Sequence, residues 1–169
     1  MIKRILLAIA VALPMCALAQ APKFGIVNVE TIIPNMAEFT EAQTKIDAAS
    51  KTYEAEYAKI QEELQKMYAD YQELEKDPNT LSSIKERRLQ DIADRDKKAQ
   101  QFAQTAHEDL QRQQAQLMQP IQEKVMTAIK AVGTENGFTM IFPEGAAAFT
   151  ATDVQDVTPL VKAKLGVKE

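Results

Sequence analysis

Few side chains in this sequence could carry acid–base or metal chemistry. His107 is the only histidine, whereas a metal site needs several Cys, His or carboxylate ligands at matched spacings. Glu62 and Glu63, like Asp94 and Asp96, fall in charged stretches typical of helix surfaces. The sequence contains no glycine-rich phosphate loop, nucleophile elbow or H-E-x-x-H motif. We therefore expect no enzyme activity, no metal and no cofactor.

The tyrosines offer a different chemistry, which is contact with varied apolar partners. All four tyrosines lie close together, at Tyr53, Tyr57, Tyr68 and Tyr71, with Met67 among them. Tyr and flexible Met side chains adapt to many apolar surfaces. Tyr53, Tyr57, Met67 and Tyr71 also have the spacing of a seam between two helices, and packing there is the simpler interpretation for these four. Tyr68 lies off that stripe and is the better candidate for binding, with Met67 and Tyr71 beside it.

The stretch from Lys76 to Lys98 carries a net positive charge. It holds seven basic and five acidic side chains, whereas the whole chain has 20 Lys and Arg against 24 Asp and Glu. We select Lys85, Arg87 and Arg88 as candidate contacts for acidic partners or for an anionic membrane surface. Alternation with acidic residues is also typical of a solvated helix surface, which is the simpler interpretation. The overall excess of acid argues against nucleic acid as a partner.

Two long helices folded back on each other would position these residues. From residue 32 onward, apolar side chains recur in steps of three and four, which indicates a helix packed against a partner along one stripe. One heptad position is held by Ile32, Phe39, Ile46, Tyr53, Ile60, Met67 and Leu74, and the other by Met36, Tyr57, Leu64 and Tyr71. At about 1.5 Å per residue, residues 38–75 would span about 60 Å and form a protruding arm.

Proline and capping patterns predict where these helices begin and end. Asp77-Pro78-Asn79 breaks the first helix and forms the tip of the arm. Ser83 and Glu86 have the spacing of a capping box, so the second helix is expected to begin near residues 80–83. Pro34 suits the first turn of the first helix. Gly137 suits the end of the second, because glycine adopts the left-handed conformation easily.

The second helix has a weaker stripe towards the tip. Its apolar positions are Ile92, Ala99, Phe102, Ala106, Leu110, Leu117, Ile121, Val125, Ile129 and Val132. Gln and Arg replace hydrophobic residues near the tip, so we expect the outer half of the arm to be the more mobile half. Pro120 removes a backbone hydrogen bond inside this helix and predicts a bend.

Short β-branched runs on both sides of the arm predict a small body. Residues 24–29 and 138–142 read as strands, and 146–150 as a further strand that pairs with 138–142 across a turn. A short final helix is expected with Thr158 as its N-cap and Pro159 at its first position. So small a body would gain stability by joining strands between subunits. The candidate oligomerisation residues are Ile26, Val27, Val29, Met140, Ile141 and Phe142.

The first 19 residues have the layout of a secretory signal. Lys3 and Arg4 precede an apolar run, and Ala17 and Ala19 are the small residues that a signal peptidase reads. Cleavage after Ala19 predicts an exported chain without cysteine. A membrane anchor is the alternative, but the run is shorter than the roughly 20 residues of a spanning helix. A lipoprotein attached through Cys16 fits less well, because Pro14 and Met15 precede that cysteine.

The order of these elements resembles the Skp/OmpH family of periplasmic chaperones. The resemblance rests on G-I-V-N-V at Gly25 to Val29, on G-F-T-M-I-F at Gly137 to Phe142, and on D-V-Q-D-V-T at Asp153 to Thr158, followed by Val161. It implies a homotrimer in which helical arms enclose a cavity for unfolded outer-membrane proteins, with no ATP, metal or catalysis. The best-studied members are strongly basic, whereas this chain is acidic, so the resemblance carries over contacts with lipopolysaccharide or anionic membranes only weakly.

The resulting hypothesis has a mainly α fold, in which a long antiparallel helical hairpin protrudes from a small β body. The signal occupies residues 1–19, the body 20–36 and 121–169, and the arm 37–120 with its tip near 76–83. The expected function is that of an ATP-independent periplasmic holdase that prevents aggregation of unfolded outer-membrane proteins. The alternative is a structural coiled-coil spacer or adaptor of the cell envelope, which would be a rigid rod with one fixed partner.

Overall fold

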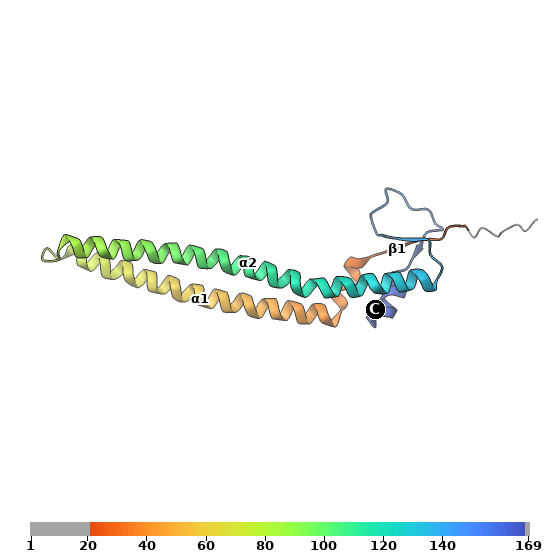
Figure 1. Cartoon of the computed structure of the whole chain (residues 1–169), viewed down its shortest axis with the longest axis horizontal. Helices are drawn as coiled ribbons and strands as arrows, with labels where there is room; N and C mark the ends of the chain where they lie inside the picture. The colour runs from red at the N-terminus through yellow and green to blue at the C-terminus, as the bar shows by residue number, and fades with distance from the viewer. Residues whose placement is uncertain (1–20, 168–169) are drawn as a thin grey trace, which may run out of the picture.

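The computed structural model describes residues 21–167 and consists of a long helical arm on a small body. Helices α1 (Ala37–Lys76) and α2 (Ser82–Glu135) run antiparallel and are joined by a tight turn at the tip (Figure 1). The mainly α fold with a protruding helical hairpin is thereby confirmed. The predicted signal, its cleavage site and Cys16 lie outside the described residues.

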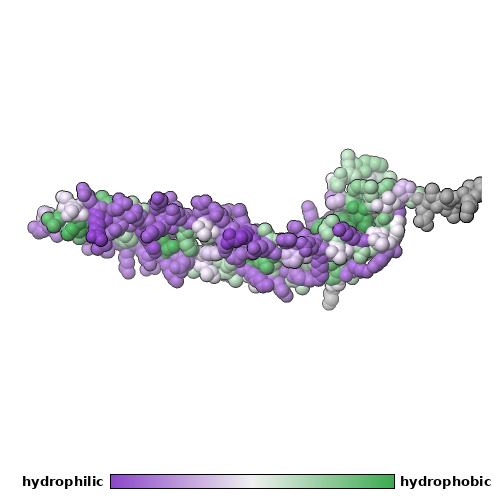
Figure 2. Space-filling view, in the orientation of Figure 1, coloured by the Kyte–Doolittle hydropathy of each residue, from purple (hydrophilic) through white to green (hydrophobic). Residues whose placement is uncertain are grey.

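The hairpin forms because each helix has one apolar stripe that needs a partner. The fully buried stripe residues are Ala42 and Leu64 in α1, and Ile92, Ala99, Ala106, Ile121, Val125, Ala128 and Val132 in α2. On the face shown in Figure 2, the arm is hydrophilic apart from scattered apolar side chains. The predicted stripe of the returning helix is confirmed, since all its members are buried or half-buried.

The buried residues fall into two separate clusters. The body cluster joins Ile32, Met36, Val125, Val157 and Val161 to the base of the arm, together with Ala42 and Ile121. The outer cluster consists of Leu64, Ile92 and Ala99, with Ile60, Met67 and Tyr71 packed against it. The arm is therefore held by apolar packing at two places along its length.

The body contains a three-stranded sheet in the order β2-β1-β3, with both pairings parallel. Strand β1 spans Phe24–Val27, β2 spans Met140–Pro143 and β3 spans Gln155–Asp156. Phe24 lies opposite Met140 and Ile26 opposite Phe142. Because the arm separates β1 from β2 in the chain, closing this sheet brings the two ends of the hairpin together.

The two faces of the sheet differ in what covers them. Gly25 and Val27 are buried against the core, where Gly25 faces Phe138 and Val157. The opposite face carries Phe24 and Ile26 of β1 with the exposed Met140 and Phe142 of β2. The ring centroids of Phe24 and Phe142 lie 6.4 Å apart. The described residues therefore leave one apolar sheet face partly open to solvent.

The predicted strand at residues 146–150 is wrong. The pairing partner of β1 on its second side is β3, and residues 144–154 form a loop that rises from the sheet on the side away from α2 (Figure 1). The run Ala146 to Phe149 has strand-like composition, but no neighbouring strand of the described chain lies alongside it. Its backbone therefore does not form a ladder.

Several predicted helix ends also differ from the structure. Pro34 lies in a separate 3-10 turn, Ile33–Asn35, and α1 begins after it. Ser83 does not cap α2, whose N-cap is Leu81 and makes no side-chain bond there. The final helix α3 is Thr158–Leu165, and Val157 takes the N-cap position.

Thr158 joins two elements through a hydrogen bond and does not cap its own helix. Its hydroxyl accepts a hydrogen bond from the backbone N–H of Asn28 at 2.9 Å, and it is buried. The carboxylate of Asp156 accepts the N–H of Thr158 at 2.8 Å instead. The buried hydroxyl connects α3 to Asn28, the N-cap of η2 (Val29–Thr31). Because the hydroxyl is used in this way, it does not cap α3 as predicted.

Two other predicted features of α2 are present. Pro120 lies inside the helix, which changes direction in its teal part (Figure 1). The helix ends at Glu135 with Asn136 as its C-cap, and Gly137 has the left-handed φ of 66°. Within residues 21–167, no helix is both long enough and apolar enough to cross a membrane.

Two glycines should respond in opposite ways to replacement by alanine. A Cβ on Gly25 would lie 3.1 Å from Phe138 and Val157, whereas the nearest atom to a Cβ on Gly133 is 3.4 Å away. We expect Gly25→Ala to lower the free energy of unfolding by about 1–3 kcal/mol, because it overpacks the core. Gly133→Ala, within α2, should raise it by about 0.5–1 kcal/mol.

Urea unfolding followed by circular dichroism at one protein concentration would compare the two variants. Equal stability of Gly25→Ala and the native chain would contradict the described packing of β1 against Phe138.

Candidate binding surfaces

The aromatic residues of the outer arm divide into packed and exposed groups. Met67 and Tyr71 are half-buried against the outer cluster, as the seam interpretation predicted. Tyr68 is 48% exposed, which confirms its predicted place off the stripe. Tyr57 occupies a seam position in the heptad and is 37% exposed, so it fills the seam only in part. Tyr57 and Tyr68 are the tyrosines that a partner could reach directly.

Tyr53 is fixed in the middle of the arm by two contacts. Its hydroxyl donates a hydrogen bond to Asp109 Oδ2 at 2.5 Å, and its ring meets that of Phe102 edge-on with centroids 6.1 Å apart. Donation to the carboxylate raises the pKa of Tyr53. The same bond, followed by the one from Gln113, lowers the pKa of Asp109. Tyr53 is therefore part of the arm's own packing, as the seam prediction implied.

The tip turn is held by Asp77 and Lys85. Asp77 accepts the backbone N–H of Asn79 at 2.9 Å and the hydroxyl of Thr80 at 3.1 Å, and the bond from Asn79 is the main reason that its pKa is lowered. Lys85 donates to the backbone carbonyls of Glu75 and Asp77 at 3.0 and 3.2 Å. A cation on the last carbonyls of α1 is favourable because these groups carry partial negative charge. The structure thus gives Lys85 a role inside the chain.

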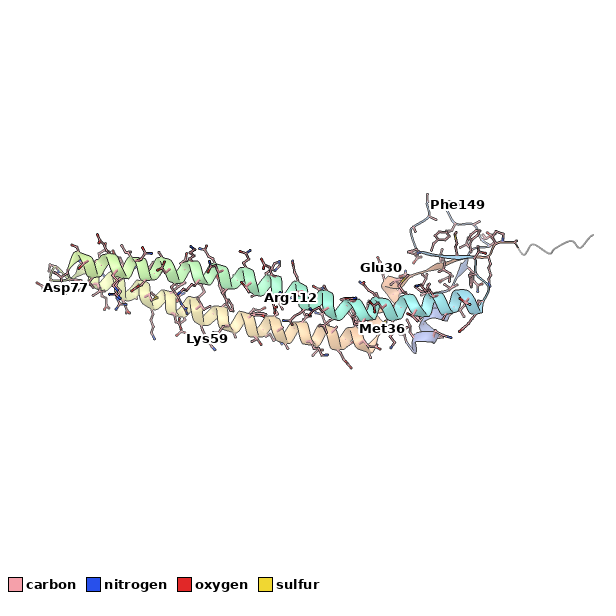
Figure 3. The ribbon with its side chains drawn as sticks, viewed as in Figure 1. Glu30, Met36, Lys59, Asp77, Arg112 and Phe149 are labelled. Atoms are coloured by element: carbon pink, nitrogen blue, oxygen red, sulfur yellow. The ribbon has the colours of Figure 1, made fainter. Side chains whose placement is uncertain are left out.

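Arg87 and Arg88 lie beside exposed apolar side chains near the tip. Together with Ser83, Ile84 and Asp91 they line an open depression of about 580 Å³. Leu81, 66% exposed, lies on the same end of the arm, as do the exposed Ile84 and Leu89. Figure 3 labels Asp77 at this end, far from Met36 and the body. The tip therefore combines cationic and apolar groups, a combination suited to an amphipathic or anionic partner.

The body offers a second apolar surface. Met140 and Phe142 are exposed on the open sheet face, whereas Ile141 points to the core and lies next to Gly133. Phe149, on the loop between β2 and β3, is 82% exposed and projects away from α2 (Figure 3). Of the other predicted body residues, Val27 is buried, and Ile26 and Val29 are half-buried. The exposed members therefore come from β2 and the following loop.

Groups for catalysis are dispersed in the described residues. His107 is exposed, and its Nε2 lies 2.9 Å from the amide of Gln111. Residues 21–167 contain no group of three or more His, Cys, Asp or Glu side chains that could hold a metal ion. The arrangement offers extended surfaces for binding rather than convergent titratable groups.

Sequence reasoning missed the apolar side chains at the tip and in the loop. Leu81 and Ile84 fall outside the heptad that predicts the seam. Their exposure could therefore have been predicted from their positions in the sequence. Phe149 was assigned to a strand because aromatic residues favour strands, so its exposure was not expected. Exposure depends on which neighbours a segment finds, and local composition does not contain that information.

Comparisons with known proteins agree with the resemblance noted from the sequence. The family described as outer membrane protein (OmpH-like) matches residues 23–165. The chaperone protein Skp of Escherichia coli K12 is 26% identical over 159 residues, which is 92% of this chain and 94% of that protein. The chaperone protein Skp of Salmonella typhimurium LT2 is also 26% identical over 159 residues.

The fold itself has a counterpart among solved structures. A crystal structure of a protein described as an OmpH-like outer membrane chaperone, from Caulobacter crescentus CB15, superposes with a TM-score of 0.73. The alignment covers 86% of this chain and 84% of that chain at 12% sequence identity. At this identity the likeness shows a shared fold.

Lys85 and Arg88 should differ in their effect on the tip turn. Replacing Lys85 by Met removes the donor to two carbonyls, and we expect local opening to become easier by about 1 kcal/mol. Arg88→Met, an exposed position without an ion pair among residues 21–167, should leave the turn unchanged. Limited proteolysis with chymotrypsin, which can cleave after Leu81, should therefore be about fivefold faster for Lys85→Met alone. Equal cleavage rates in the two variants would contradict the inference that Lys85 stabilises the tip turn.

Proposed function

Because the chain belongs to the OmpH-like family of outer membrane proteins, which matches residues 23–165, we propose that it acts as a chaperone for outer-membrane proteins. Its relatives in Escherichia coli and Salmonella typhimurium carry the name chaperone. In finer terms, we propose an ATP-independent periplasmic holdase. It binds unfolded outer-membrane proteins between helical arms and prevents their aggregation.

The observation that carries this proposal is the open arm with reachable aromatic side chains. Tyr57 and Tyr68 are exposed on α1, and Leu81 and Ile84 at the tip. An unfolded chain presents many different apolar segments, and scattered side chains on a long rod can meet them without a shaped pocket. Weak contacts at several places add up when one client touches them together. The arrangement supports broad binding to unfolded chains.

The open apolar face of the body supports assembly into an oligomer. Met140 and Phe142 are exposed on strand β2, and Phe149 is exposed on the loop that follows it. An exposed sheet edge and face of this kind are commonly covered by another subunit. We propose a homotrimer, the assembly implied by the family resemblance, with these residues at the contact between subunits. The arms of three copies would then surround a shared space for the client.

The tip supports contact with anionic groups. Arg87 and Arg88 lie outside the ion pairs of the described chain and line a depression together with Ile84 at the end of the arm. We propose that a membrane surface with anionic head groups, including lipopolysaccharide, binds weakly here. Such contact would place the client close to the membrane it enters.

The alternative function is a structural spacer or adaptor of the cell envelope. A spacer needs a uniformly packed rod, because its length must be constant. In this arm, the middle of the seam includes small and polar side chains, such as Ser50, Ala106 and Asp109, beside the aromatic pair of Tyr53 and Phe102. Helices packed in this way separate more easily than helices joined by a continuous aliphatic seam. The holdase hypothesis is therefore the better supported of the two.

Aggregation assays would test the proposed holdase activity. A urea-unfolded outer-membrane β-barrel is diluted into buffer containing the mature chain without nucleotide, and light scattering is followed. We expect near-stoichiometric trimer to suppress scattering for several unrelated barrels. If the chain is shown by circular dichroism to be folded and yet suppresses aggregation of no barrel, the spacer function would be favoured.

The exposed tyrosines should contribute directly to this suppression. In Tyr57→Ser with Tyr68→Ser, we expect the apparent affinity for the unfolded barrel to fall by about fivefold or more, since truncating an important contact residue costs more than about 1 kcal/mol. The matched control is Gln65→Ser with Gln72→Ser, two exposed polar positions on the same helix. An equal loss in both pairs would mean that the tyrosines are not specific contact residues.

The oligomer should depend on the open sheet face. Phe142→Asp places a charge where an apolar subunit contact is proposed, and we expect the variant to sediment as a monomer with its helix content retained. Ala55→Asp, an exposed position on the arm, is the control and should keep the oligomeric state of the native chain. If the Phe142→Asp variant sediments as a trimer, the subunit contact must lie on another surface of the body.

A further inference from the structure

The middle of the arm is packed differently from its two ends. It lies between the body cluster and the outer cluster, in residues 43–59 of α1 and 100–116 of α2. Ala106 is the one fully buried residue of these two stretches. Most of the other seam positions there are half-buried, whereas Tyr57 is exposed, and the half-buried ones include the polar residues Ser50, Asp109 and Gln113. Apolar burial therefore contributes less to helix pairing here than on either side.

A polar contact between the helices takes the place of apolar packing in this interval. The Tyr53 hydroxyl donates to Asp109 Oδ2 at 2.5 Å across the seam. The Asp109 side chain is only 18% exposed. Arg95–Glu63 and Lys124–Glu38 also join α1 to α2, but they lie on the exposed surface. Hydrogen bonds to a charged and partly desolvated acceptor are stronger than exposed ones.

Asp109 is held in position from its own helix as well. Gln113 donates to the same carboxylate at 2.5 Å, and Arg112 forms an ion pair with it. Figure 3 labels Arg112 along the arm between Asp77 at the tip and Met36 at the base. The carboxylate thus keeps two partners on α2 if the tyrosine leaves, so separating the helices does not leave a charge without partners. This is the condition under which such a bond can open and close reversibly.

The Tyr53 ring adds a second, coupled contact. It packs edge-on against Phe102 with an angle of 64° between the rings. The hydroxyl and the ring therefore join α1 to α2 at two points that lie about two turns apart along α2. When the hydroxyl bond breaks, the same movement would separate the two rings and expose them to solvent.

We propose that Tyr53 and Asp109 form a latch at a hinge in the middle of the arm. When it is closed, the two helices are in register between the separately packed base and outer segments. When it opens, α1 and α2 separate locally, Tyr53 and Phe102 become accessible, and the outer segment swings as a unit. If the chain is a holdase as proposed above, this movement would let one arm adapt to clients of different size and offer two further aromatic rings to them.

Hydrogen–deuterium exchange of the full mature protein, without client, would test the latch. Tyr53→Phe keeps the ring and removes only the hydroxyl. We expect amide exchange in residues 46–57 and 102–113 to become roughly two- to tenfold faster, the range that corresponds to the loss of one hydrogen bond. Exchange in residues 60–71 and 88–99, which carry the outer cluster, should remain as in the native chain.

Two further variants make the test specific. Tyr57→Phe removes a hydroxyl from an exposed tyrosine one turn away and should leave exchange unchanged. Asp109→Asn keeps an acceptor for Tyr53 but loses the charge, so it should show a smaller acceleration than Tyr53→Phe.

Exchange rates equal to those of Tyr57→Phe, or an equal acceleration along both helices, would overturn the latch. The first outcome would mean that the Tyr53–Asp109 hydrogen bond does not stabilise the pairing of the helices. The second would mean that Tyr53 stabilises the whole arm and not its middle alone. Because no client is present, either outcome leaves the aggregation test of the proposed function independent.

Discussion

The structure depends on a narrow apolar seam between two long helices. Two helices, α1 of 40 residues and α2 of 54, bury one stripe each, so most of their surface must remain in water. A globular core would bury more area per residue, and it would also hide the side chains. Apolar packing is instead concentrated in two clusters, at the base and in the outer half of the arm. The long accessible surface is a direct consequence of this limited burial.

The body solves the problem of anchoring such a rod. Strand β1 precedes the arm, β2 follows it, and β3 comes from still further along the chain, yet all three pair in one parallel sheet. Opening the hairpin at its base would therefore break strand pairing as well as the contacts of Met36, Val125 and Val161. The coupling fixes the base, while the outer arm is joined to the body only through its own helices. Any bending of the arm consequently produces a larger displacement further from the sheet.

Much of this architecture could be predicted because it follows from local spacing. The heptad of α1, the break at Asp77-Pro78-Asn79 and the left-handed Gly137 each depend on residues close in sequence. The errors arose where a residue finds a distant partner. Thr158 binds the backbone of Asn28 instead of capping its own helix. The run Ala146 to Phe149 has the composition of a strand but no partner strand within the described chain, so composition alone misassigned it.

The charge of the chain bears on how an unfolded client would be held. With 20 basic against 24 acidic side chains, the protein lacks a strong positive field that would draw acidic clients along its whole length. The stretch from Lys76 to Lys98 at the tip carries a net positive charge, with seven basic against five acidic side chains, and Leu81 and Ile84 are also exposed there. If the chain holds clients as proposed, attraction of acidic groups is expected mainly at this end, and contact along the shaft would use aromatic side chains such as Tyr57 and Tyr68. Apolar contacts are weakened little by salt, so a client held in this way would stay bound where ionic strength varies.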